Sequence, residues 1–137
     1  MMSTKIEASH NKIRRTEDLD ELAALLFPRN RNQQRIFLAI FVELKWADGQ
    51  FLPTLEWVAD QHGLSRRVLE TVRAKMRRLG LIDHVSRFNT RHGCREGWVF
   101  SNKLAHALRQ LADLSDHLRE CKGPMQQMKE QDLYRYL

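Results

Sequence analysis

The hydrophobic residues of this chain recur with helical spacing over most of its length. Residues 33–46, QQRIFLAIFVELKW, carry large apolar side chains on nearly every side, so this helix is predicted to form the centre of the core. A stripe of leucine and alanine over residues 17–27 predicts an earlier helix, which ends at Phe27-Pro28. Residues 103–121 predict a long final helix whose leucines gather on one side.

Two helices joined by a tight turn are predicted in the middle of the chain. The first spans residues 55–62 and ends at Gly63, where the backbone needs a positive φ. The second spans residues 66–79, is capped by Ser65 and stops at Gly80. Its apolar residues are spaced so that they share the face toward the core, and they are Leu69, Val72, Met76 and Leu79.

Two apolar stretches after this pair have the composition of strands. They are residues 81–88 and 97–101, and the polar segment between them predicts a β-hairpin with a longer loop. Residues 50–52 predict a short extended piece before the helix pair. Trp46 and Trp98 are expected in the core. The predicted fold class is mainly α with a small β-hairpin.

The order helix, short strand, helix, turn, helix and hairpin resembles the winged helix-turn-helix superfamily, in particular its MarR-like and ArsR-like regulators. The resemblance covers roughly residues 33–101 and is carried by Val58-Ala59, Gly63-Leu64-Ser65, Leu69, Val72, Met76, Leu79 and Gly80-Leu81-Ile82. It implies a winged helix-turn-helix with extra N-terminal and C-terminal helices, in which the hairpin is the wing. It also implies sequence-specific binding of double-stranded DNA and a role in transcriptional regulation.

The charge distribution agrees with a nucleic-acid partner. Residues 61–100 hold nine basic and three acidic side chains, a net charge of +6, and the whole chain also has a net charge of +6. The remaining residues therefore sum to zero. A neutral scaffold with one basic helix and one basic loop is typical of a surface that binds duplex DNA.

The resemblance implies which side chains meet the DNA. The N-terminal part of the second helix would enter the major groove and read base edges with Arg66, Arg67, Glu70 and Thr71. Contacts to the DNA backbone would come from Ser65, Arg73, Lys75, Arg77 and Arg78. The wing would contribute Arg87, Asn89, Arg91, His92 and Arg95, with Arg91 inserted into the minor groove.

The predicted organisation is a flexible basic arm over residues 1–15, the domain with its flanking helices over residues 16–122, and a tail over residues 123–137. The leucines of the 103–121 helix either pack on their own domain or form a homodimer seam. We expect a homodimer, in which the 17–27 helix could share the interface, because two-fold dimers place two recognition helices about one DNA turn apart.

Other functions find less support in the sequence. No catalytic motif or paired carboxylates are found, so we do not expect an enzyme or a cofactor. His92 and Cys94, or His117 and Cys121, could be metal ligands, but no dense cluster predicts a metal site. Cys94 could also be an oxidant-sensing thiol. Two alternatives remain open: a DNA-binding protein for the replication or partition of a plasmid, phage or mobile element, and a winged-helix adaptor that binds proteins.

The composition also bears on location. No run of about 18 apolar residues is found, so no membrane span is expected. The first residues are polar and basic, which does not fit a secretory signal. Two cysteines give no disulfide framework, so a reducing, cytoplasmic setting is expected.

Overall fold

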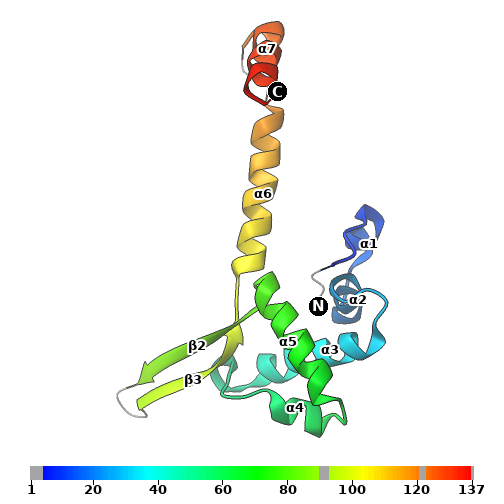
Figure 1. Cartoon of the computed structure of the whole chain (residues 1–137), viewed down its shortest axis with the longest axis vertical. Coiled ribbons are helices and arrows are strands. Elements are labelled where there is room, and N and C mark those ends of the chain that lie inside the picture. Colours follow the sequence, from blue (N-terminus) through cyan, green and yellow to red (C-terminus); the bar gives the residue numbers. More distant parts are fainter. Residues whose placement is uncertain (1–4, 90–92, 121–122, 137) are drawn as a thin grey trace. The chain divides into compact units, whose positions relative to one another are not determined.

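The structure, a computed structural model, describes residues 5–89, 93–120 and 123–136. The side chains of Arg87, Asn89 and Cys94 are outside this description. The fold is mainly helical, with one small antiparallel sheet (Figure 1). The chain divides into two compact units, Met1–Leu104 and Ala105–Leu137.

The first unit holds most of the secondary structure. Its elements are α1 (His10–Arg15), α2 (Leu19–Leu26), α3 (Arg31–Trp46), the 3-10 turn η1 (Asp48–Gln50), β1 (Phe51–Leu52), α4 (Glu56–Gln61), α5 (Arg66–Leu79), β2 (Ile82–Asn89) and β3 (Gly93–Phe100). Helix α6 (Lys103–Arg119) begins in the first unit and continues into the second, which also holds α7 (Met125–Tyr136).

The local signals around α4 and α5 act as predicted. The bounds of α5 agree with the sequence prediction, and the Ser65 hydroxyl oxygen accepts a hydrogen bond from the Val68 amide at 3.4 Å. Gly63 has φ of 64° and Gly80 has φ of 84°, the left-handed region where a residue without Cβ is favoured. Helix α5 therefore starts and stops at its capping residues, whereas α4 has Leu55 at its N-cap, with no side-chain hydrogen bond there.

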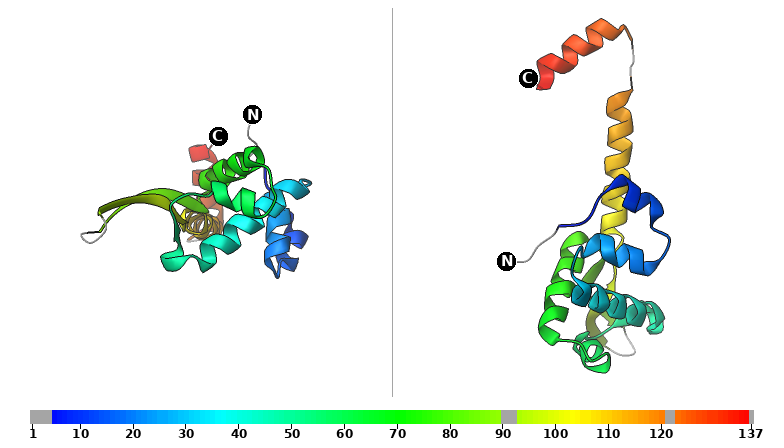
Figure 2. Two further views of the ribbon diagram at one scale, coloured as in Figure 1. Left: turned by 90° about the horizontal axis from the view of Figure 1, so that it is seen from below. Right: turned by 90° about the vertical axis from the view of Figure 1, so that its right-hand side faces the viewer.

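Helix α3 is the centre of the core, as predicted. It packs against α2, α4, α5 and β3, and the right-hand view of Figure 2 shows α3 in cyan directly below α2 in blue. Ile36, Phe37, Ile40 and Leu44 are at most 1% exposed. The prediction for Trp46 was wrong: this residue is 78% exposed, because it lies on the same outward face of α3 as the exposed Arg35 and Val42, whereas Leu44 of the same turn faces the core. Trp98 is partly buried and packs against the core.

The sheet has the order β1-β3-β2 and is antiparallel throughout. Strands β2 and β3 pair from Ile82 with Phe100 to Asn89 with Gly93, so the hairpin is longer than predicted. Strand β3 begins at Gly93, before the predicted residue 97, because Gly93–Glu96 lack the large apolar side chains that identify a strand in a sequence.

Gly97 allows β1 to lie close to β3. A Cβ atom at Gly97 would lie 2.5 Å from Cζ of Phe51 and 2.6 Å from the carbonyl oxygen of Leu52. Both distances are far below van der Waals contact. Glycine at this position therefore permits the third strand of the sheet.

Residues 5–15 differ from the predicted flexible arm. Residues His10–Arg15 form α1, and the Glu7 amide donates a hydrogen bond to the carbonyl oxygen of Leu25 at 2.7 Å. This bond ties the segment to the last turn of α2. The polar composition did not reveal it because backbone hydrogen bonds are independent of side-chain type.

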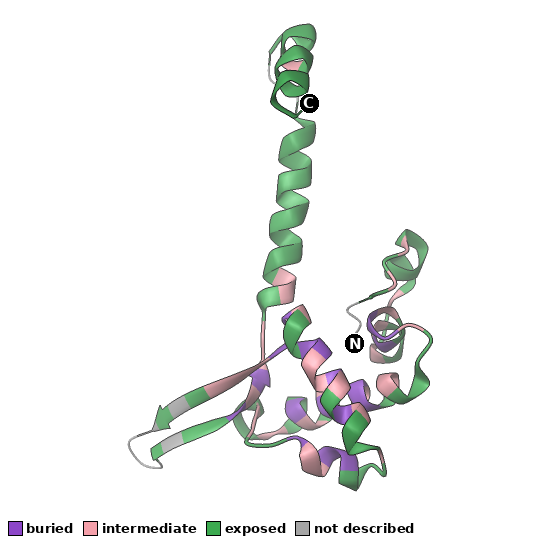
Figure 3. Ribbon diagram, in the orientation of Figure 1, coloured by how far each residue is buried: buried purple, intermediate pink, exposed green. Residues whose placement is uncertain are grey.

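The second unit has no buried residue in either helix among the described residues. Most of α6 is exposed, as the green colour of this helix in Figure 3 shows. Leu108, Leu111, Leu114 and Leu118 are 51% to 63% exposed. The apolar stripe of α6 is therefore not used by the described part of the chain.

Candidate nucleic-acid interface

The turn between α4 and α5 fixes which face of α5 points outward. Ala59 is buried, and its carbonyl oxygen accepts a hydrogen bond from the Leu64 amide at 2.8 Å across the turn. On α5, Leu69, Val72 and Met76 are at most 1% exposed. At about 100° per residue, the opposite face of the helix carries Arg67, Glu70, Thr71, Ala74 and Arg78.

Arg73 is held inside the first unit. Its Nη1 donates to a carboxylate oxygen of Glu56 at 2.7 Å, and its guanidinium lies 5.2 Å from the centre of the Trp98 ring. The hydroxyl of Thr54, and then Arg73, hold the pKa of Glu56 at about 2. With 20% of its side chain exposed, Arg73 anchors α5 to α4 and β3, which does not fit its predicted role as a DNA backbone contact.

Arg77 also interacts with the base of the hairpin. Its Nε lies 3.8 Å from a carboxylate oxygen of Asp83, and its guanidinium lies 6.0 Å from the Trp98 ring centre. Asp83 also accepts a hydrogen bond from Lys103 at 2.9 Å, which is the main cause of its lowered pKa. More than half of the Arg77 side chain stays exposed, so it still presents charge to the outside.

Arg66, the first residue of α5, pairs with Asp60 at the end of α4. Its Nε and Nη2 lie 3.1 Å and 2.5 Å from the two carboxylate oxygens. These bonds lower the pKa of Asp60 and raise that of Arg66. Both side chains are more than half exposed.

The predicted role of Lys75 does not agree with its position in the structure. It was expected to contact DNA backbone, but it is 5% exposed. Its ammonium group donates to the carbonyl oxygens of Leu26 at 2.5 Å and Lys5 at 2.7 Å, and it lies 4.6 Å from the Phe27 ring centre. Burial lowers the pKa of Lys75. Its charge is therefore directed into the protein, where it joins the N-terminal segment and α2 to α5.

Arg67 and Arg78 have no carboxylate partner among the described residues. Both are exposed and lie on the outward face of α5, eleven positions or about 16 Å apart along the helix axis. Arg67 also lines an open hollow of about 200 Å³ between the start of α3 and α5. The other residues of this hollow are Asn30, Asn32, Gln33, Val68 and Thr71.

The hairpin contributes fewer described side chains. Arg95 is exposed, and its guanidinium lies 5.5 Å from the centre of the Phe51 ring. The predicted wing residues Arg91 and His92 lie outside the described residues, as do the side chains of Arg87 and Asn89. The structure thus brings together Arg66, Arg67, Glu70, Thr71 and Arg78 on one face, with Ser65 capping the start of the same helix.

Two arginines of α5 have acidic partners on α4 that were not predicted from the sequence. Asp60 precedes Arg66 by six positions across the turn, and this short spacing could have signalled the pair. Glu56 lies 17 positions from Arg73, and only the crossing of α4 and α5 brings them together. The acidic side chains of α4 therefore decide which arginines of α5 remain free.

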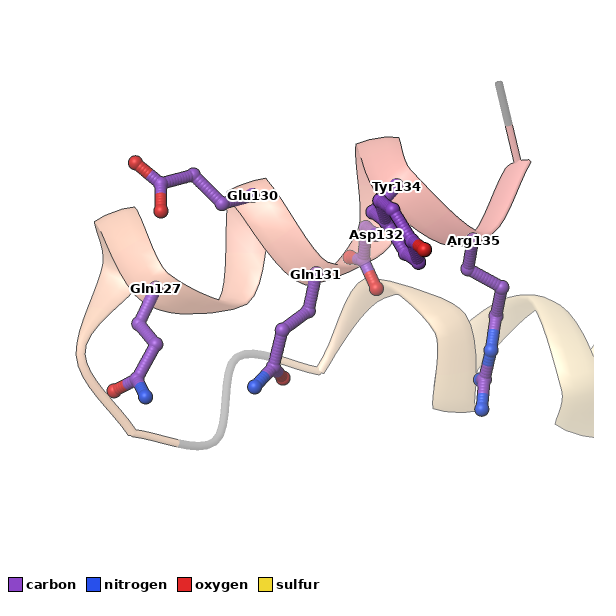
Figure 4. Close-up of a pocket in the computed structure, with 6 residues that line it drawn as sticks. All are labelled: Gln127, Glu130, Gln131, Asp132, Tyr134 and Arg135. Atoms are coloured by element: carbon purple, nitrogen blue, oxygen red, sulfur yellow. The ribbon is translucent and has the colours of Figure 1, made fainter.

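Other sites are not supported by the described residues. No group of three or more His, Cys, Asp and Glu side chains is placed to hold a metal ion in the described part of the chain. A hollow of about 690 Å³ in the second unit is lined by side chains of α7 alone. Figure 4 shows that Glu130 points to the side opposite Gln127 and Gln131, so these polar groups do not converge on one ligand.

Comparisons with protein-family models, with curated proteins and with solved structures gave no match to this chain. In the described residues, no helix is both long and apolar enough to cross a membrane.

Proposed function

We propose that the first unit is a winged helix-turn-helix domain that binds double-stranded DNA with sequence specificity and regulates transcription. The order of α3, β1, α4, α5 and the hairpin supports this assignment. The observation that carries it is the outward face of α5, where Arg67 and Arg78 have no described internal partner. Unpaired arginines on an exposed helix are available to phosphates and base edges.

In this proposal α5 is the recognition helix and lies in the major groove. Its 14 residues span about 21 Å, enough to cross the groove. The first two turns present Arg66, Arg67, Glu70 and Thr71 to base edges, where arginine pairs with guanine and glutamate accepts from cytosine. Arg78 and the exposed part of Arg77 contact phosphates. The hairpin approaches the neighbouring minor groove or backbone with Arg95 and the other basic residues of the wing.

The proposal includes a homodimer formed through α6. Leu104, Leu108, Leu111 and Leu118 are spaced by 4, 3 and 7 residues, so they lie along one side of the helix. Alanines at positions 105, 107 and 112 flank this side and allow close approach. A second copy of α6 would cover the leucines that the described chain leaves exposed.

A titration of the full chain with fluorescent duplex DNA tests the proposal. DNA binding predicts an affinity that falls steeply between about 50 and 200 mM salt, because bound arginines displace counterions. Selection of bound sequences from random duplexes should then yield a preferred site. No affinity for duplex at 50 mM salt would favour a protein-binding adaptor and contradict the proposal.

A further inference from the structure

The pair between Asp60 and Arg66 uses a particular edge of the guanidinium. The two carboxylate oxygens of Asp60 accept from Nε at 3.1 Å and from Nη2 at 2.5 Å, so the carboxylate lies alongside the fork. The pair is open to the outside, since the side chains of Arg66 and Asp60 are 64% and 54% exposed. It joins the end of α4 to the first residue of α5.

The donors that remain on Arg66 match those that guanine requires. A guanidinium carries five N–H groups, and Asp60 takes two of them. The two of Nη1 and one of Nη2 remain, and these form the end of the fork. Two donors on this edge can bond O6 and N7 of guanine together, the commonest specific contact between arginine and DNA. The carboxylate of Asp60 therefore leaves the base-reading edge unoccupied.

We propose that Asp60 is a positioning residue that holds Arg66 for reading one guanine in the major groove. This inference rests on the proposed function. An arginine side chain loses rotamer freedom when it binds a base, and Asp60 restricts that freedom before DNA arrives. Asp60 also places a negative charge near the DNA, which opposes binding to phosphates at any sequence. Both effects favour discrimination between base pairs over affinity for DNA of any sequence.

Arg67 is the matched control within the same helix. It lies beside Arg66 in the sequence and is exposed, but no described carboxylate pairs with it. Its guanidinium is not held in advance. Removal of Asp60 should therefore change base preference at the position read by Arg66 and leave the position read by Arg67 unchanged.

The test uses full-length protein and the preferred site found by selection from random duplexes. Binding is measured to that site, to variants with each guanine replaced, and to a random duplex, for wild type, Asp60→Asn, Arg66→Ala, Arg67→Ala and the double variant Asp60→Asn/Arg66→Ala. At one guanine, wild type should discriminate about ten-fold or more. Arg66→Ala should reduce the preference for guanine at one position of the site. Asp60→Asn should reduce the preference several-fold at that same position. Its affinity for random duplex should equal or exceed that of wild type.

The outcomes separate the inference from the proposed function. In the Arg66→Ala background, Asp60→Asn should have no further effect on base preference. Full discrimination in Asp60→Asn, or an equal loss of affinity on all duplexes with an unchanged unfolding midpoint, would overturn the inference while DNA binding stands. A wild-type chain that binds no duplex would refute the proposed function and this inference with it.

Discussion

The ammonium group of Lys75 on α5 donates a hydrogen bond to the carbonyl oxygen of Leu26, the last residue of α2, at 2.5 Å. Carbonyl groups at the end of a helix have no partner within it, so this bond satisfies one that would otherwise be buried and unpaired. The same group bonds the Lys5 carbonyl oxygen at 2.7 Å. Lys75 is therefore part of the structural frame that holds α5.

Substitution Lys75→Met should destabilise the first unit and leave its DNA binding intact. The apolar stem is kept, but the Leu26 carbonyl loses its donor, at a cost of about 1–3 kcal/mol in the free energy of unfolding. Urea denaturation measures this cost. The dependence of DNA affinity on salt should stay unchanged. If the slope of log affinity against log salt were smaller by about one in Lys75→Met than in wild type, Lys75 would contact a phosphate.

The hydrogen bonds that the Glu56 carboxylate accepts from Thr54 and then from Arg73 predict a loss of stability in acid. The pKa of Glu56 is about 2 in the folded protein against an ordinary value of 4.5. Between these values the unfolded chain binds more protons, so the contribution of Glu56, present above about pH 4.5, is lost as pH falls toward about 2. Denaturation across this range should show a smaller loss of stability in Glu56→Gln. An identical pH dependence in both proteins would contradict the role of these hydrogen bonds.

Gly97→Ala should disturb the sheet, because the new Cβ would clash with β1. Cζ of Phe51 lies 2.5 Å from that position, and the backbone carbonyl oxygen of Leu52 lies 2.6 Å from it. Crowding of this kind costs about 1–3 kcal/mol in the free energy of unfolding. Glu96→Ala, at the exposed neighbouring position of β3, should change it by less than about 0.5 kcal/mol. Equal effects of the two substitutions would contradict the close packing of β1.

The exposed stripe of α6 predicts the oligomeric state. If a second copy covers it, Leu108→Lys together with Leu111→Lys should convert a dimer to a monomer, because charges cannot be buried in an apolar seam. The unfolding midpoint of the first unit should not change. Gln110→Lys, between these positions in the sequence but on the polar side, is the control. Sedimentation of wild type as a monomer at tens of micromolar would contradict the homodimer.

The sequence predicted those elements whose signals are local. The bounds of α5 depend on Ser65 and Gly80, and the burial of α3 depends on its dense apolar content, so both were confirmed. The long hairpin and the docking of residues 5–15 depend on backbone pairing that side-chain patterns do not reveal. Trp46 was misplaced because α3 carries apolar residues on nearly every side, so its sequence does not show which face stays outward.

The outward face of α5 could be predicted from the sequence, but the tertiary contacts of its basic residues could not. The spacing of Leu69, Val72 and Met76 identifies the outward face of α5, and the structure agrees with it. It could not show that Lys75 turns inward or that Arg73 pairs with Glu56, since these partners lie far away in the sequence. The free arginines are therefore fewer than the basic residues of the helix.

The most direct measurement is the salt dependence of duplex binding for wild type and for Arg67→Ala/Arg78→Ala. Each arginine that contacts a phosphate adds about one to the slope of log affinity against log salt. Loss of an arginine that contacts a base lowers affinity mainly at the preferred site. We expect wild type to bind duplex DNA strongly and in a salt-dependent manner. The double variant should bind the preferred site and random duplex more weakly, with a shallower slope. Unchanged binding by the double variant, or no binding by wild type at 50 mM salt, would contradict the assignment of α5 as the DNA-binding surface.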